Sequence, residues 1–255
     1  MAGPNVTEKC TNRYCEIPAG SFQMGSTSGY DDEQPAKTVT MTGFELGQTE
    51  VSVSDYQTYL AKTSTQFQAV VSGLPNLREN EKGGDFPIVG LSFDKKRAYC
   101  QAQGGDLPTA AQLHYASRFD VQDSAAGEED QRILLENLQS TELLEFVEHP
   151  EHGYTKPVKH GYKNRLGVYN LLGNVWESAL DAYDKGFYAR MAPKDPYNPL
   201  TNPWSPENPA GQFQEMSGGS LFSRGQWNAG PTSRGRTSPT ISGDEVGFRC
   251  ARPLP

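Results

Sequence analysis

The feature that most constrains the fold of this chain is a series of short glycine- and aromatic-containing motifs that follow one another along almost its whole length. Any one of them could arise by chance, whereas the ordered set is a strong constraint. No internal repeat links them, so they do not indicate an array of repeated units. The motifs occupy residues 16–25, 47–53, 86–93, 98–100, 107–109, 167–177, 218–220 and 246–251.

Length and composition favour one compact unit. A chain of 255 residues fits one elaborated domain, and no stretch made only of Pro, Gly and Ser separates two apolar-rich halves. With 35% hydrophobic residues, 26 glycines and 18 prolines, the chain can build a core but uses much of its length in turns. We therefore predict a single domain over 1–255 with long irregular segments.

In sequence order, the motifs resemble those of the formylglycine-generating enzyme family, also called the sulfatase-modifying factor family. The resemblance implies an α+β fold with low regular secondary structure, a version of the C-type lectin fold. Within it we expect an N-terminal disulfide loop at 1–15 and a C-terminal lectin-like region at 216–255. An insertion is expected at 120–165, because an acidic, polar stretch there precedes renewed helical spacing of Leu and Ile.

Local patterns predict one strand and three helices. Residues 39–46 alternate like a half-buried strand that leads to Gly47. Ser54 is the expected cap of a helix that runs to about Lys62, and a second helix follows Ser92 and ends before Gly104. A third begins at Thr109, where Gln112 completes a capping box.

The four cysteines bear on pairing and compartment. An even count alone permits three pairings. The family resemblance implies a Cys100–Cys250 disulfide, which leaves Cys10–Cys15 as the second. Disulfides persist in oxidising compartments, so this pairing favours a periplasmic, secreted or surface-exposed protein. The alternative is four reduced thiols in a cytosolic protein.

Charge and hydropathy argue against two classes of partner. The net charge is −8 and Lys and Arg form no run, so we expect no nucleic-acid binding. No stretch approaches the roughly 18 uninterrupted apolar residues of a membrane helix, so no transmembrane segment is expected. The N-terminus shows neither the basic start nor the apolar region of a signal peptide.

A structural calcium ion is implied at the motif 170–177. Calcium prefers six to eight oxygen ligands, and in the family the Asn and Glu of this motif bind it with help from backbone carbonyls. The resemblance carries this role to Asn170 and Glu177 through their side chains, and to Leu171, Gly173 and Val175 through their carbonyls. The alternative is an Asn-Gly turn followed by a buried Trp and an ion-paired Glu.

The oxidase chemistry of the family is not expected. The family requires two cysteines separated by five positions just after Gly-Gly-Ser, because thiolates capture copper(I) and one engages the substrate cysteine. Those positions hold Ser223 and Asn228 here, whose oxygens are poor copper(I) ligands. We therefore expect no copper and no formylglycine generation.

The favoured function is binding of a protein or small-molecule ligand at the C-terminal surface. Aromatic and Arg side chains are the usual anchors of such surfaces. Relatives in diversity-generating retroelements vary this same region, so the chain is a candidate variable protein. The aromatic-rich stretch 184–214 either lines a binding surface or packs locally. The predicted ligand-binding residues are Ser220, Phe222, Ser223, Arg224, Gln226, Trp227, Asn228, Arg234 and Arg236.

The alternative function is an enzyme that resembles the periplasmic pyoverdine-maturation protein of the family, which acts on a siderophore precursor. Its candidate catalytic residue is Glu245, which would act as a general base if burial raised its pKa. The competing interpretation of Glu245 is an exposed turn residue paired with Arg249 or Arg236. The basic residues near the C-terminus have a similar alternative, as solvated side chains or structural ion pairs. The sequence predicts no oligomeric state.

Overall fold

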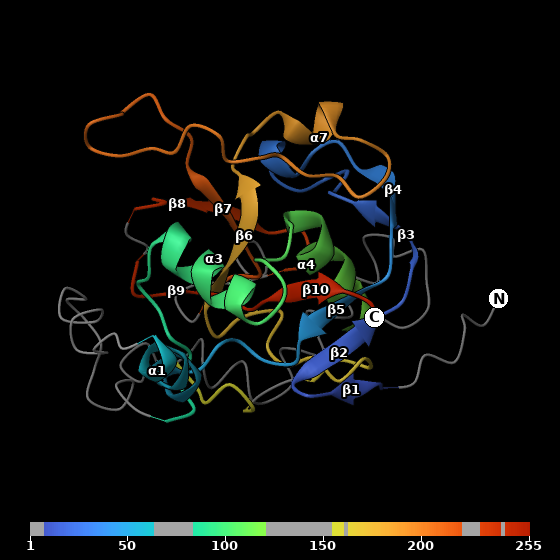
Figure 1. Cartoon of the computed structure of the whole chain (residues 1–255). Coiled ribbons are helices and arrows are strands. Elements are labelled where there is room, and N and C mark those ends of the chain that lie inside the picture. Colours follow the sequence, from blue (N-terminus) through green and yellow to red (C-terminus); the bar gives the residue numbers. More distant parts are fainter. Residues whose placement is uncertain (1–7, 64–83, 121–154, 161–162, 221–229, 241–242) are drawn as a thin grey trace.

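The computed structural model describes residues 8–63, 84–120, 155–160, 163–220, 230–240 and 243–255. Short elements joined by long loops form a mixed α and β architecture (Figure 1), which confirms the predicted fold class. The strands are β1 (Cys10–Thr11), β2 (Tyr14–Ile17), β3 (Gly20–Met24), β4 (Lys37–Met41), β5 (Phe44–Gly47), β6 (Trp176–Ala182), β7 (Gln214–Ser217), β8 (Arg234–Thr237), β9 (Val246–Gly247) and β10 (Ala251–Pro253). The helices are α1 (Val53–Lys62), α3 (Phe93–Ala102), α4 (Ala110–Ser117) and α7 (Phe187–Arg190), with 3-10 turns η1 (Asp31–Glu33) and η3 (Arg118–Asp120).

One sheet joins the two ends of the chain. Its strand order is β1-β2-β5-β10, and every pairing in it is antiparallel. The disulfide Cys10–Cys15 links β1 to β2, and Cys100–Cys250 links α3 to the residue before β10. Both pairings implied by the family resemblance are therefore present in the structure.

The strand predicted at 39–46 is instead two strands that belong to different sheets. β4 pairs with β3 in a two-stranded sheet, whereas β5 lies between β2 and β10. The break falls at Thr42, whose backbone N–H and hydroxyl both donate to the carboxylate of Asp195, each at 2.7 Å. A partner 153 residues away thus ends the strand, which alternation of apolar residues does not reveal.

The helices begin where local capping chemistry places them. Ser52 and Asp55 form the capping box of α1, two residues earlier than the predicted cap at Ser54. The predicted capping box of Thr109 and Gln112 is present at α4. α3 ends at Ala102 ahead of Gly104, whose φ of +83° is the left-handed conformation that glycine adopts most easily.

The second four-stranded sheet, β8-β7-β6-β9, carries the C-terminal region. Its strands pair antiparallel except β6 and β9, which are parallel. α4 contacts both β6 and β7 of this sheet and also β3 and β4 (Figure 1), so nearly all of its side chains are buried. This central position brings a polar residue of α4, His114, against β7.

No helix within the described residues is long and apolar enough to cross a membrane. Most of the predicted insertion, residues 121–154 and 161–162, lies outside the described residues.

Candidate functional site

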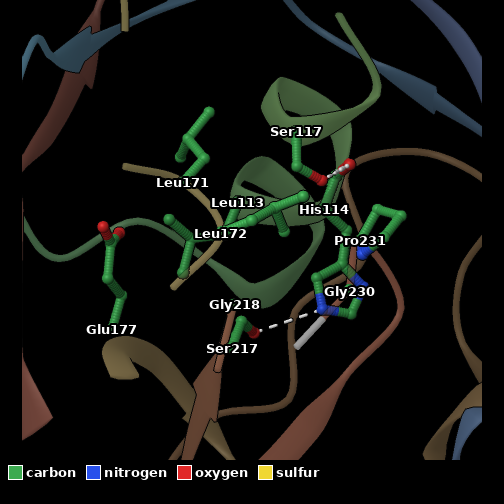
Figure 2. A pocket seen from close by; sticks show the side chains of 10 residues that line it. All are labelled: Leu113, His114, Ser117, Leu171, Leu172, Glu177, Ser217, Gly218, Gly230 and Pro231. Atoms are coloured by element: carbon green, nitrogen blue, oxygen red, sulfur yellow. Dashed lines mark hydrogen bonds between the residues drawn. The ribbon is translucent and has the colours of Figure 1, made fainter. Parts of the chain in front are cut away.

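A small cavity lies at the base of the predicted binding loop, where β7 ends and the chain returns toward β8. Its volume is about 10 Å³, near the space that one buried water occupies. Gly218 and Gly230, on either side of residues 221–229, both line it. The remaining lining residues, drawn in Figure 2, are Leu113, His114, Ser117, Leu171, Leu172, Glu177, Ser217 and Pro231.

A buried hydrogen-bonded chain runs through His114 beside this cavity. The Nε2 atom of His114 lies 3.2 Å from the hydroxyl of Ser217, as Figure 2 shows, and Nδ1 lies 3.1 Å from the hydroxyl of Tyr188. Burial, together with the positive charges of Arg234 and Arg118, lowers the pKa of His114 to about 3. The imidazole is therefore neutral at ordinary pH, with one ring nitrogen able to donate a hydrogen bond and the other able to accept one. Sequence reasoning missed this residue, because a single His on a helix carries no motif.

The neutral state of His114 has a measurable consequence for stability. An unfolded His takes up a proton near its ordinary pKa of about 6.5, whereas the folded imidazole resists protonation until about pH 3. The wild-type protein should therefore lose stability as pH falls from about 6.5 toward 3, more steeply than His114→Asn. Urea denaturation of both proteins at several pH values measures this difference. Parallel stability curves for the two proteins would contradict it.

Arg234 is not at the ligand surface, which corrects the sequence prediction. Its side chain and that of Glu215 are 0% and 1% exposed, and the guanidinium binds both carboxylate oxygens at 2.8 and 2.6 Å. The same guanidinium lies 4.2 Å over the ring of Tyr188. Arg234 therefore braces β8 against β7, in the structural ion pair that was the alternative interpretation.

Ser220 and Glu245 lie together, although they are 25 residues apart in sequence. The Ser220 hydroxyl donates to the Glu245 carboxylate at 2.6 Å, and the backbone carbonyl of Glu245 accepts from the N–H of Trp176. Ser220 is buried and Glu245 is half-buried. Glu245 therefore links the segment after β7 to the start of β9. Arg249, one of the two partners expected for Glu245, forms its salt bridge with Glu177.

The motif 170–177 forms a buried polar cluster around two carboxylates. Asn170 and Asn174, both with left-handed backbone, direct their amide nitrogens to the two oxygens of Glu50 at 3.2 and 2.8 Å. Glu177 accepts from the guanidinium of Arg249 at 2.5 to 2.9 Å. Burial raises the pKa of Glu50 to about 7, which the charge of Arg249 partly offsets.

In this arrangement the two side chains predicted to bind calcium are engaged within the protein. Glu177 is already neutralised by Arg249, and the amide nitrogen of Asn170, not its oxygen, is turned to a carboxylate. The N–H of Gly173 donates to the carbonyl of Gly218, and a Cβ at Gly218 would lie 2.6 Å from the Leu171 oxygen. Calcium at Asn170, Leu171, Gly173, Val175 and Glu177 stays a prediction from resemblance.

The predicted surface is only partly described. Phe222, Ser223, Arg224, Gln226, Trp227 and Asn228 lie outside the described residues. Arg236 is exposed on β8, and its guanidinium stacks over the rings of Phe213 and Tyr183. The four cysteines of the chain are all in the two disulfides, so the structure holds no free thiol.

The family described as "Sulfatase-modifying factor enzyme 1-like domain" matches residues 3–254, and the chain belongs to this family. The chain is 26% identical to a formylglycine-generating enzyme of Streptomyces coelicolor over 98% of its own length and 92% of that protein.

Two solved structures share the fold. PvdO from Pseudomonas aeruginosa superposes with a TM-score of 0.70 at 20% identity, covering 94% of both chains. Treponema denticola variable protein 1 superposes with a TM-score of 0.66 at 18% identity, covering 94% of this chain and 95% of that one. At these identities the likeness concerns the fold alone.

Proposed function

We propose that this chain is a ligand-binding member of its family and not a formylglycine-generating oxidase. The observation that carries the proposal is the pairing of all four cysteines in disulfides. Copper(I) capture and engagement of a substrate cysteine both need a thiolate, and Ser223 and Asn228 supply oxygen and amide groups in its place. The chain therefore keeps the scaffold but lacks the sulfur ligands of that reaction.

The structure on either side of residues 221–229 suits a protein that presents a binding loop to a ligand. Ser220 at one end of the loop and Glu245 near the end of the C-terminal region are hydrogen-bonded, and the Arg234–Glu215 pair braces the strands beneath. Such a base holds a loop without specifying its side chains, which suits a binding surface that changes its sequence. We extend this to a variable-protein role, by analogy with the Treponema denticola protein of the same fold. The disulfides favour an oxidising compartment.

Loop variants test this proposal. A random peptide library displayed on phage is panned against the immobilised wild-type protein, and enriched clones are then scored against variants. Clones should lose binding to Arg224→Ala/Trp227→Ala, because large anchors dominate such interfaces. The matched control is Leu254→Ala, which removes an exposed apolar side chain beside β10 in another sheet. Melting temperatures should stay within about 2 °C of wild type. Clones that bind all three proteins equally would overturn the proposal.

The cavity favours a second candidate function, an enzyme on the same scaffold. A hydroxyl 3.2 Å from a neutral imidazole is the arrangement of a serine nucleophile and its base. In this role Ser217 would attack an ester carbonyl while His114 takes the hydroxyl proton and passes it to the leaving alcohol, and water would then release the acid. Ser217 is 2% exposed, so a substrate would reach it only after a local opening of the site. Absence of fluorophosphonate labelling at Ser217 in the native protein would remove this candidate.

A further inference from the structure

Arg236 differs from the other ring-stacked guanidiniums of the described chain. Arg97, Arg190, Arg234 and Arg252 also lie over aromatic rings, and each forms a salt bridge with a carboxylate. Arg236 lies 5.1 Å over Phe213 and 6.0 Å over Tyr183, yet no carboxylate of the described residues pairs with it. Its cross-strand neighbour is Glu215, whose two carboxylate oxygens are already bound by Arg234. Within the described part of the chain, Arg236 is therefore an exposed cation that forms no salt bridge.

The rings beneath Arg236 are held in place by their own neighbours. The indole of Trp204 stacks on Phe213 with centroids 5.3 Å apart and planes 20° apart. The carbonyl of Phe213 accepts from the N–H of Tyr183, and the N–H of Trp204 donates to the carbonyl of Gln212. The row Trp204, Phe213, Arg236 and Tyr183 is therefore built before any partner arrives, which lowers the entropy cost of binding.

Stacking determines which groups of Arg236 remain available. A guanidinium that lies flat over a ring keeps its N–H donors free at the edges of its plane. Two parallel N–H groups of one edge match the two oxygens of a carboxylate. Trp204 and Phe213, both half-buried, offer apolar surface beside that edge. The geometry suits a carboxylate attached to an aromatic or apolar group.

We propose that Arg236, Trp204, Phe213 and Tyr183 form an anion subsite of the ligand surface, which takes a carboxylate of an acidic peptide segment with an aromatic or apolar side chain beside it. This inference rests on the proposed binding function and names the chemistry of its ligand. Phe213, Trp204 and Tyr183 lie outside the C-terminal loop to which the sequence assigned the ligand, so the surface is wider than predicted. Trp204 and Phe213 belong to the stretch 184–214, so the subsite follows the binding-surface interpretation of that stretch.

Small probes test the subsite directly. The probes are N-acetylphenylalanine, its neutral amide and phenyl phosphate, titrated into ¹⁵N-labelled protein and followed at the arginine Nε–H resonances. The acid should shift the Arg236 resonance and bind at least about tenfold more tightly than the amide, because only the acid forms the charge-assisted pair. Arg236→Lys should lose most of this preference, since Lys keeps the charge but not the planar fork.

The matched control is Arg190→Ala, which removes an exposed ring-stacked arginine that already pairs with Asp184. This variant should bind the acid as the wild type does. Equal binding of acid and amide, or undiminished acid binding by Arg236→Ala, would overturn the subsite. Binding of phenyl phosphate without binding of the acid would overturn its assignment to carboxylates. If the probes fail but the phage clones still lose binding to Arg224→Ala/Trp227→Ala, only the subsite is wrong. If the clones bind that variant as well as they bind wild type, the proposed binding function itself is wrong.

Discussion

Replacing Arg249 with Met should lower the free energy of unfolding by about 3–5 kcal/mol, the usual cost of removing one partner of a buried ion pair. Arg249 and Glu177 have side chains 0% and 2% exposed, and Arg249 also donates to the carbonyls of Gly47 and Tyr169. Without the guanidinium, Glu177 and Glu50 would share a buried site with no positive charge to offset them. Denaturant unfolding under non-reducing conditions measures the loss.

Arg252→Met provides the matched comparison. Arg252 also pairs with a glutamate, Glu45, but its side chain is 27% exposed, so the loss should be about 1 kcal/mol or less. The double variant Glu177→Met/Arg249→Met should recover part of the stability lost in the single variant, because no charge is then left buried alone. If the two single variants unfold at the same denaturant concentration, the cluster around Glu177 does not have the role assigned to it.

Removing the Cys100–Cys250 disulfide should cost about 5 kcal/mol in the chain-entropy model, because its residues are 150 apart in sequence. The double variant Cys100→Ala/Cys250→Ala removes the bridge and leaves no unpaired thiol. We expect a large loss of stability in denaturant, or failure to fold at 37 °C. The bridge also fixes α3 next to the segment between β9 and β10 that carries Arg249, so its loss should loosen the buried cluster as well.

The second disulfide is the internal control for the first. Cys10 and Cys15 are only five residues apart, so the same model gives about 2 kcal/mol for Cys10→Ala/Cys15→Ala. The larger loss should therefore belong to the longer loop. Similar losses for the two variants would mean that loop length does not set the contribution of these bridges.

The sequence predicted those helix ends that depend on contacts within a few residues. Thr109 and Gln112 cap α4 because their side chains reach backbone N–H groups within one turn. Gly104 follows α3 because a left-handed residue is needed after the last turn. The family resemblance supplied what spacing could not, namely the fold and the two cysteine pairings.

The sequence did not predict which side chains would pair with residues far away along the chain. Arg234 and Arg236 are two residues apart on one strand, yet one is buried against Glu215 and the other is exposed over Phe213. That difference depends on where β8 lies against β7 and the stretch 184–214. His114 likewise acquires its role only because α4 packs against β7, 103 residues away in sequence.

The measurement that tests the central claim most directly is a count of reactive thiols in unreduced protein unfolded in guanidinium chloride, with a fully reduced sample as the positive control. The structure pairs all four cysteines, so we predict no reactive thiol before reduction and four after it. Two or more thiols before reduction would contradict the claim, because a thiolate for copper and substrate cysteine would then be available.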